Sequence, residues 1–355
     1  MGLARERLDA LVSAAIHAPA RLPYLCKSLA RGNPALREWC RRTLDQGFQP
    51  VVICRLERLG DVVACTPVAR HLKVKLGAKT RIAWVCASDY AFLLHGNPDI
   101  DEVFIEPCLT TWWVARSRLP PAIIVVELFL DTDRCCWTGL RMKQRSSGIT
   151  THNYYGERRS LLSAYSGAAG YPTPDDLPRL TVFEQERFEA LDSRPKKEKR
   201  LAVHFFSRNK ERSWNAESAA CFCRTAAAHG WKIVELGKEQ VVASRLAQVR
   251  SPPPAGGLNG QLSALARADL FVGVDSGFAH CANALRIPAL VLLGQFRSFP
   301  DYFPYSGNHA HSDSWRCLRS GGSMEGMSAE TVWKDFDDFA SMVARIPGPV
   351  RAETT

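Results

Sequence analysis

The chain has 355 residues, 46% hydrophobic and 23% charged, which excludes a disordered chain and allows two domains of ordinary size. Its formal net charge of +10 favours anionic partners, such as nucleotide phosphates, acidic glycolipids or a membrane surface. No zinc-finger spacing, RNP-like aromatic motif or lysine-rich tail is present, so nucleic acid is not a predicted partner.

Residues 1–46 combine helical spacing of apolar residues with an excess of arginine. We interpret them as a basic helical extension packed on the body of the protein. Contact with an anionic membrane is the alternative. The first 20 residues lack the apolar core of a signal peptide, and the longest apolar runs are too short to span a membrane. We therefore expect a cytoplasmic protein, which the membrane alternative would place at the cytoplasmic face of the inner membrane.

The next part of the chain alternates strand-like and helix-like segments. The expected strands are 51–54, 80–86, 103–105 and 123–130, and the expected helices are 62–76 and 90–95. Repeated βα units predict a parallel sheet with helices on both faces. We expect a Rossmann-like domain over residues 47–192.

The loop after the first strand carries the first candidate site. Gly60 permits a tight strand-to-helix turn, and Asp61 follows at a helix start, where the helix dipole stabilises a carboxylate. An ionised carboxylate can act as a general base, although a helix cap is the simpler role for Asp61. Arg55 and Arg58 lie on the same loop, where they could neutralise phosphate or orient Asp61.

A polar, charged segment, residues 193–200, is the predicted linker to a second α/β domain over 201–355. This half repeats the alternation. The expected strands are 201–205 and 232–236, and the expected helices are 216–229 and 240–248. Residues 251–260 hold three prolines and two adjacent glycines, which favour a loop inside the domain. Two such domains predict a cleft between them, faced by the carboxyl ends of the strands.

Residues 270–294 predict a strand, a tight turn, a short helix and a second strand. Asp275 and Ser276 are good N-cap residues, and Gly277 lets a bound group approach the backbone closely. His280 adds a donor on the first helical turn. A helix that starts at the carboxyl end of a parallel strand suits a phosphate, so we predict an anion site; an ordinary capped βαβ unit is the alternative.

The 12 cysteines show no disulfide or metal pattern, because no CxxC occurs and most lie in apolar runs. A reduced protein is the simplest interpretation. Asp131, Thr132 and Asp133 spell the DxD motif of metal-dependent transferases and follow the strand expected at 123–130. At the edge of the expected cleft they could contact the acceptor or the donor, and metal binding is the alternative.

Two motifs about 215 residues apart together resemble the lipopolysaccharide heptosyltransferase group, glycosyltransferase family 9. The first is R-x-x-x-x-G-D-x-x-x-x-x-P, which begins at Arg55, and the second is D-S-G-x-x-H-x-x-x-A, which begins at Asp275. The similarity covers about residues 50–345, including the run WVCASDYAFLLHGNPDIDEVF and the segment SRNKERSW. Each motif is weak alone, but their order and spacing are specific.

The resemblance implies a GT-B fold, with the acceptor on the N-terminal domain and the nucleotide sugar on the C-terminal one. It implies inverting transfer of a heptose from ADP-heptose to a growing lipopolysaccharide core, with neither metal nor cofactor. Asp61 matches the family's proposed base, and we assign Arg55 and Arg58 to the acceptor side. The positions matched to the donor side are Ser207, Arg212, Glu239, Asp275, Ser276, Gly277 and His280.

Some features depart from the family pattern. Arg212 stands where the family usually has a lysine, so a planar fork replaces a point charge. Residues 1–46 have no counterpart that we can place. The sugar could be another heptose or a hexose, and the acceptor another surface glycan or a protein. The protein-modifying branch carries paired cysteines for a metal, whereas this chain has only Cys317 in that region.

Two other functions fit the same architecture. A sugar-nucleotide epimerase needs acid and base groups on both faces of the sugar, but Asp61 is the one convincing candidate. A non-catalytic nucleotide-sugar-binding protein would bind a nucleotide sugar without turning it over. We expect a glycosyltransferase in which Asp61 deprotonates the acceptor hydroxyl, while Arg212 and the backbone at Ser276 and Gly277 stabilise the departing diphosphate.

Overall fold

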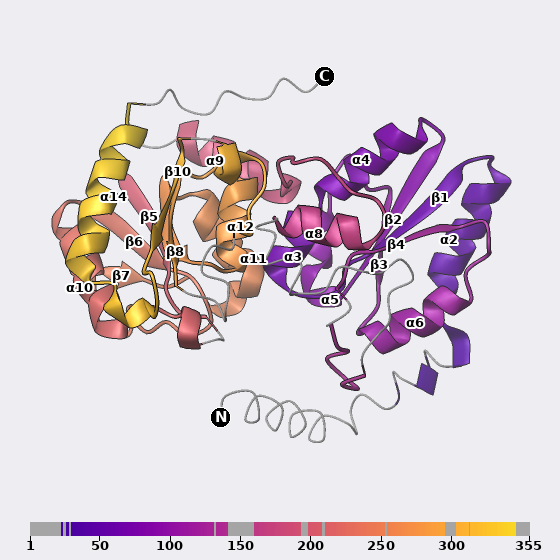
Figure 1. The fold of residues 1–355 in the computed structure, drawn as a ribbon, viewed down its shortest axis with the longest axis horizontal. Helices are drawn as coiled ribbons and strands as arrows, with labels where there is room; N and C mark the ends of the chain where they lie inside the picture. The colour runs from indigo at the N-terminus through magenta and orange to yellow at the C-terminus, as the bar shows by residue number, and fades with distance from the viewer. Residues whose placement is uncertain are drawn as a thin grey trace. The chain divides into compact units, whose positions relative to one another are not determined.

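The computed structural model describes residues 23, 26–27, 30–130, 133–140, 160–192, 198–207, 210–252, 254–294, 303–311 and 313–345. The chain divides into two compact units, Met1–Asp175 and Asp176–Thr355, which appear in Figure 1 in indigo to magenta and in magenta-pink to yellow. Each unit is a layered α/β structure around a parallel sheet. The two Rossmann-like halves expected from the alternating pattern are therefore present.

The first unit is built on a parallel sheet with strand order β3-β2-β1-β4. Its strands are β1 (Gln49–Cys54), β2 (Thr80–Cys86), β3 (Glu102–Ile105) and β4 (Ile124–Glu127). Its helices are α2 (Pro34–Asp45), α3 (Leu59–Ala64), α4 (Pro67–Leu76), α5 (Ser88–Ala91), the 3₁₀ turn η1 (Phe92–Leu94), α6 (Leu109–Ser117) and α8 (Leu161–Ala168).

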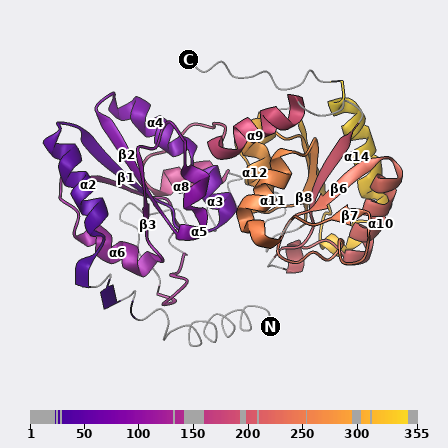
Figure 2. The same ribbon diagram turned by 180° about the vertical axis from the view of Figure 1, so that it is seen from behind.

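Helices cover both faces of this sheet, with α2 and α4 on opposite sides in Figures 1 and 2. One face packs Val52 of β1 and Val85 of β2 against buried residues of α2 and α6, among them Cys40 and Trp112. Because successive residues of a strand point to opposite faces, the intervening apolar residues face the other layer. Burial on both faces explains why β1 and β2 are almost continuously apolar.

The second unit has a parallel sheet with strand order β10-β9-β8-β5-β6-β7. Its strands are β5 (Lys199–His204), β6 (Trp231–Glu235), β7 (Val249–Arg250), β8 (Leu270–Val274), β9 (Ala289–Leu293) and β10 (Trp315–Arg319). Its α-helices are α9 (Thr181–Asp192), α10 (Ala216–Ala228), α11 (Gly257–Ala266), α12 (Gly277–Ala284), α13 (Asn308–His311) and α14 (Ala329–Val343). Its 3₁₀ turns are η2 (Lys210–Arg212), η3 (Pro254–Gly256) and η4 (Met324–Gly326).

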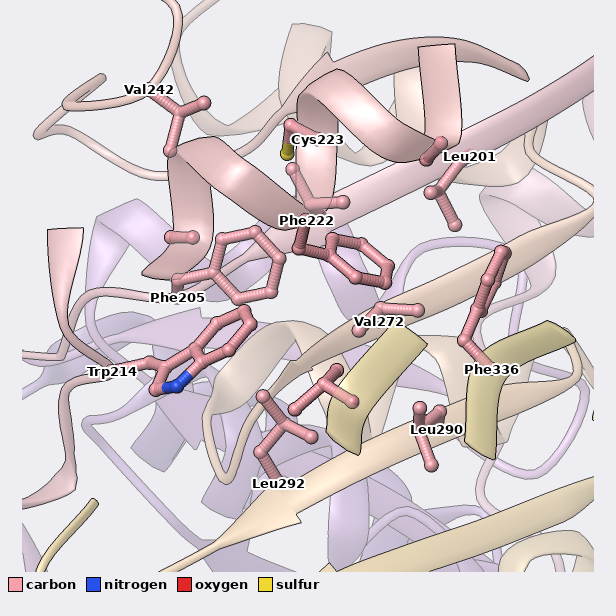
Figure 3. Packing of buried hydrophobic residues seen from close by; sticks show 14 of the residues in the cluster. Leu201, Phe205, Trp214, Phe222, Cys223, Val242, Val272, Leu290, Leu292 and Phe336 are labelled. Atoms are coloured by element: carbon pink, nitrogen blue, oxygen red, sulfur yellow. The ribbon is translucent and has the colours of Figure 1, made fainter. Parts of the chain in front are cut away.

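Helices α10 and α14 lie on one side of this sheet and α11 and α12 on the other (Figures 1 and 2). Figure 3 shows the core beneath α10 and α14, where Phe205, Trp214, Phe222 and Phe336 meet apolar side chains of the strands. The Phe222 ring makes edge contacts with Phe205 at 6.0 Å and Phe336 at 5.4 Å between centroids. This packing fixes the segment that leads from β5 to α10.

Both sheets share one topological feature that positions functional groups. When the strands are numbered within each unit, the first sheet has the order 3-2-1-4 and the second the order 3-2-1-4-5-6, as in a Rossmann fold. The strand order therefore reverses beside β1 and beside β5. In the second unit, α10 and α12, the helices that follow β5 and β8, lie on opposite sides of the sheet (Figures 1 and 2). In the first unit, α8, which follows β4, contacts α3 and α4, which follow β1. Ligand sites in open α/β sheets lie outside the carboxyl ends of the strands at such a switch point.

Several predicted elements need correction. The helix expected over 62–76 is two helices, because Pro67 lacks the N–H that a continuous helix needs and starts α4 instead. The helix expected over 240–248 is a series of turns, in which the Glu235 carboxylate accepts the amides of Val242 and Ala243. The loop expected over 251–260 ends early, because α11 begins at Gly257.

The boundary between the units precedes the predicted linker. Helix α9 is part of the second unit, where the Arg187 guanidinium donates to the carbonyls of Ala266 and Ala268 at 3.2 and 2.9 Å. Most of the predicted linker, residues 193–197, lies outside the described residues. The described part of the basic extension contains α2, which buries Leu36 and Cys40 against the first sheet.

Candidate functional site

Asp61 lies at the switch point of the first unit, in the first turn of α3. Its Oδ2 accepts hydrogen bonds from the Arg55 guanidinium and from the Tyr165 hydroxyl, the latter at 3.1 Å. Arg58 adds an ion-pair contact to the same oxygen at 4.0 Å. Within the described residues, Oδ1 accepts no hydrogen bond. One oxygen therefore anchors the carboxylate, and the other remains available to a substrate.

Arg55 holds this arrangement together. Only 5% exposed, it also donates to the carbonyl of Leu128 at 2.9 Å and pairs with Asp133 at 3.2 Å, and its guanidinium lies 4.4 Å from the Tyr165 ring centroid. Burial raises the pKa of Tyr165 well above its usual range, so this hydroxyl stays protonated and donates to Asp61. Arg55 directly follows β1, Asp133 lies in the connection after β4, and Tyr165 lies in α8.

The backbone of Arg58 is strained, since its φ of 70° is uncommon for a residue with a Cβ. This conformation lets the chain turn from β1 into α3 while the Arg58 side chain stays exposed. An adjacent pocket of about 340 Å³ is partly open to solvent, and three arginines and two acidic residues are among those that line it. Its lining residues are Arg55, Leu56, Glu57, Arg58, Leu109, Phe129, Asp133 and Arg134.

The DxD sequence is only partly described, because Asp131 and Thr132 lie outside the described residues. The Asp133 carboxylate accepts from Arg55 and from the backbone amide of Leu130 at 3.1 Å. It therefore helps to hold Arg55. In the described parts of the chain, no group of three histidine, cysteine or acidic residues is arranged to hold a metal ion.

The second unit has a polar cluster at its own switch point. Arg212, at the end of η2, donates to the backbone carbonyl of Asp275 at 2.8 Å and approaches its carboxylate at 3.6 Å. The hydroxyl of Tyr305 donates to Asp275 Oδ1 at 3.0 Å. Tyr305 also packs against the ring of His280, with centroids 4.7 Å apart. Asp275 thus fixes an arginine on one side and a tyrosine on the other.

Ser276 and Gly277 stand at the start of α12. Ser276 has extended N-cap dihedrals, yet its side chain makes no capping hydrogen bond and its buried Oγ has no hydrogen-bond partner among the described residues. A serine here usually satisfies a free helical N–H. The Ser276 hydroxyl and the free amides of the first turn are therefore all available to an anion.

His204 ends β5 beside this cluster, and the sequence interpretation did not include it. Burial, together with the charge of Arg212, lowers its pKa to about 4, so its imidazole is neutral at neutral pH. A Cβ on Gly237 would lie 3.0 Å from this ring, which requires a glycine at that position. Glu239, two residues further along the same loop, is exposed.

Ser207 follows β5, where its backbone is locked to Ser213 by hydrogen bonds of 2.9 and 3.1 Å. Arg212 and Asp275 are in contact, as are the rings of His280 and Tyr305, whereas Glu239 makes no contact with them within the described residues. The important residues missed from the sequence are Tyr165, Tyr305 and His204. Tyr165 is 104 positions from Asp61, so no local motif could connect the two.

All twelve cysteines, each of which is described, are free thiols. The thiols of Cys54, Cys86 and Cys281 are buried, as expected for small hydrophobic residues. Among the described helices, none has the length and apolar character needed to cross a bilayer.

Comparison with known families now bears on both clusters. Residues 153–314 match the family model described as Glycosyltransferase family 9 (heptosyltransferase). The chain resembles glycosyltransferase family 9. The matched region contains the whole Arg212–Asp275–Tyr305 cluster and Tyr165. It begins after Asp61 and does not include that residue. Among curated proteins, none matches the sequence.

Solved structures resemble the whole two-unit architecture. A glycosyl transferase family 9 protein from Veillonella parvula is 17% identical, with a TM-score of 0.62 over 83% of this chain and 98% of that one. ADP-heptose lps heptosyltransferase II from E. coli is 16% identical, with a TM-score of 0.61 over 83% and 99%. E. coli heptosyltransferase WaaC, solved with ADP, is 16% identical, with a TM-score of 0.54 over 84% and 100%. The GT-B fold expected from the sequence is therefore confirmed, and the family match supports a glycosyltransferase.

Proposed function

We propose that this protein transfers a heptose or a related sugar from ADP-heptose to a lipopolysaccharide core or another surface glycan, with inversion at the anomeric carbon. The observation that carries the proposal is that both polar clusters lie at the switch points of their sheets, where α/β folds bind ligands. The family match and the ADP and heptose names of the similar structures support the choice of donor.

On the acceptor side, Asp61 acts as the general base. Arg55 and Tyr165 hold Oδ2, so the unbonded Oδ1 can take the proton of an acceptor hydroxyl without breaking the anchoring contacts. The hydroxyl oxygen then forms a bond to the anomeric carbon as the bond from that carbon to the diphosphate oxygen breaks. Arg58 and Arg134 at the pocket give the acceptor side a positive rim suited to an anionic glycan.

On the donor side, the diphosphate binds at the start of α12. The amides of the first helical turn and the unpartnered Ser276 hydroxyl donate to phosphate oxygens, and Arg212 supplies positive charge. Negative charge grows on the leaving diphosphate during transfer, so donors held in place stabilise the transition state more than the ground state. Asp275 and Tyr305 act as positioning residues for this cluster. Glu239 and Ser207 are proposed contacts to the nucleoside and phosphate.

The test is to incubate the purified protein with ADP-, UDP- and GDP-sugars, each with and without a lipopolysaccharide-core acceptor. The expected result is nucleoside diphosphate release from ADP-heptose that depends on the acceptor, with the sugar recovered on the glycan. Interconversion of two nucleotide sugars without an acceptor would show an epimerase instead. Tight binding of a nucleotide sugar with no turnover under any condition would show a binding protein.

A further inference from the structure

Glu57 lines the pocket at the end of β1, and the proposed transfer gives it no role. It stands in the loop between β1 and α3, just before the candidate base. The backbone of this loop is held on both sides of Glu57. On one side the Leu56 carbonyl accepts the Ala87 amide at 3.0 Å, and on the other the Arg58 carbonyl accepts the Val62 amide, also at 3.0 Å. The loop therefore keeps Glu57 at the pocket.

The half-buried Glu57 carboxylate lacks the contacts that such a group normally makes. Its Oε1 is buried, yet this oxygen accepts no hydrogen bond within the described residues. The side chain does not cap the helix that follows, since the start of α3 has no side-chain capping hydrogen bond. A buried oxygen without a donor is costly, and a donor on a bound molecule removes that cost.

The three arginines that line the same pocket make their contacts elsewhere. Arg55 and Arg58 are both directed to Asp61. Arg134 donates to the carbonyl of Gly139 at 3.1 Å. Within the described residues none of the three forms an ion pair with the Glu57 carboxylate, so this group is free to accept a donor from a ligand.

Another part of the pocket wall is apolar. Leu56, Leu109 and Phe129 line it, and all three are buried. A hydrogen bond to a carboxylate is stronger beside such a wall than in open water, because the local dielectric is lower. A sugar has hydroxyl groups that donate hydrogen bonds and C–H faces that pack on apolar side chains. One open carboxylate beside an apolar wall therefore suits a sugar unit.

We propose that Glu57 is a specificity-determining residue of the acceptor side, where its carboxylate accepts a hydrogen bond from an acceptor hydroxyl other than the one that reacts. The inference rests on the proposed function, because it assigns the pocket to the acceptor of the transfer. Glu57 orients the sugar, while Asp61 takes the proton of the reacting hydroxyl. An acceptor that lacks the hydroxyl bound by Glu57 leaves the carboxylate unpaired in the complex and so binds more weakly.

The test measures transfer from ADP-heptose to the lipopolysaccharide-core saccharide without its acyl chains, and to analogues that each lack one non-reacting hydroxyl. In the wild type, one of these analogues should have a KM about tenfold to a hundredfold above that of the complete saccharide. Glu57→Ala should raise the KM of the complete saccharide by a similar factor. It should also use that analogue and the complete saccharide equally well, because the hydroxyl no longer has a partner. The kcat and the KM for ADP-heptose should stay near wild type.

Two further variants control for charge and for folding. Glu57→Gln keeps the shape and one acceptor oxygen but loses the charge, so its acceptor KM should lie between those of the wild type and Glu57→Ala. Glu102→Gln, at an exposed glutamate of β3, should behave as the wild type. Circular dichroism checks the fold of each variant. An unchanged acceptor KM in folded Glu57→Ala, or equal losses for every analogue in both proteins, would overturn the assignment.

Direct binding separates this assignment from the proposed transfer. Calorimetry of the same saccharide with the full-length protein requires neither donor nor turnover. If the wild type transfers no sugar, yet Glu57→Ala binds the saccharide about tenfold more weakly than the wild type, the site at Glu57 stands and the proposed transfer fails. Equal saccharide affinity in the two proteins would refute the role of Glu57 whether or not sugar is transferred.

Discussion

At Asp61, the structure separates the two carboxylate oxygens by function. Arg55 and Tyr165 occupy Oδ2, whereas Oδ1 has no hydrogen bond within the described residues. A base must be held firmly, yet it must also leave one oxygen open to the proton it accepts. At Asp275, a single residue likewise holds two side chains, Arg212 and Tyr305, by hydrogen bonds.

Replacing Asp61 with asparagine should lower turnover by roughly 10²-fold or more, the usual scale for a lost general base. Asparagine keeps the shape of the side chain but cannot accept the proton, and ADP affinity should stay unchanged. The measurement is kcat from ADP release, together with calorimetry for ADP. Asp89→Asn, the same change at an exposed position of the first unit, is the matched control. Near-normal turnover in a folded Asp61→Asn protein would remove this residue from the reaction.

Tyr165→Phe tests the support of the base. The substitution removes the 3.1 Å hydrogen bond to Asp61 but keeps the ring beneath Arg55. A hydrogen bond to an ionised carboxylate is worth about 1.5–3 kcal/mol, so kcat should fall by about tenfold to a hundredfold while KM for the donor stays constant. Steady-state kinetics separates the two constants. A lower free energy of unfolding with an unchanged kcat would assign Tyr165 a structural role alone.

Arg212→Ala should weaken ADP binding by about tenfold to a hundredfold, because a charge-assisted hydrogen bond to phosphate is worth about 1.5–3 kcal/mol. Arg212→Lys should lose less, since it keeps the charge but not the fork. Calorimetry with ADP, UDP and GDP measures this effect and the base preference together. Arg245→Ala, at an exposed arginine of the same unit, is the control. Equal ADP affinity in wild type and Arg212→Ala would exclude Arg212 from the donor site, and preference for UDP or GDP would exclude ADP-heptose.

At the scale of elements, two buried histidines couple the second unit to pH. His204 ends β5, and His309 lies in α13, where its amide donates to Asn283 at 2.8 Å. Burial lowers their pKa values to about 4 and about 3, from the usual 6.5. Below pH 6.5 these two histidines therefore bind protons in the unfolded chain but not in the folded chain. The free energy of unfolding thus falls as the pH falls from 6.5 toward these values.

Between pH 7 and pH 5, each of these histidines should cost about 2 kcal/mol of unfolding free energy. His204→Gln and His309→Gln should each reduce that pH dependence, even if the substitution itself lowers stability. Urea unfolding at the two pH values measures the difference for each variant. His229→Gln changes the exposed histidine that caps the C-terminal end of α10 and serves as the control. A wild-type pH dependence in both buried variants would contradict this account.

At the scale of the whole molecule, each Rossmann-like unit places one polar cluster at its own switch point. The candidate base, Asp61, follows β1, which is the first strand of its unit. The candidate phosphate site at Asp275 follows β8, which pairs with β5 at the switch point of the second unit. In the proposed function, the acceptor chemistry and the donor chemistry are divided between the sheets of the two units. This division explains why changes at Asp61 and at Arg212 should have separable effects.

Transfer should survive a chelator. The described residues contain no metal-ligand group, Asp133 is paired with Arg55, and the donor side offers helix amides and Arg212 to the diphosphate. ADP release should therefore be equal with and without EDTA, measured after extensive dialysis against it. If EDTA abolished transfer and Mg²⁺ or Mn²⁺ restored it, the acidic residues Asp131 and Asp133 would become the first candidates for ligands.

The sequence by itself determined most of the strands, the two α/β halves and the loops that carry Asp61 and Asp275, because these depend on local apolar runs and turn residues. It did not predict the edge strands β7 and β10. It overextended helices at Pro67 and at residues 240–248, where a missing N–H and the Glu235 carboxylate decide the backbone. Only the tertiary structure brought Tyr165 to Asp61 and Tyr305 to Asp275. Those contacts join residues 104 and 30 positions apart, and the packing of helices and loops on the sheets creates them, so no local pattern in the sequence predicts them.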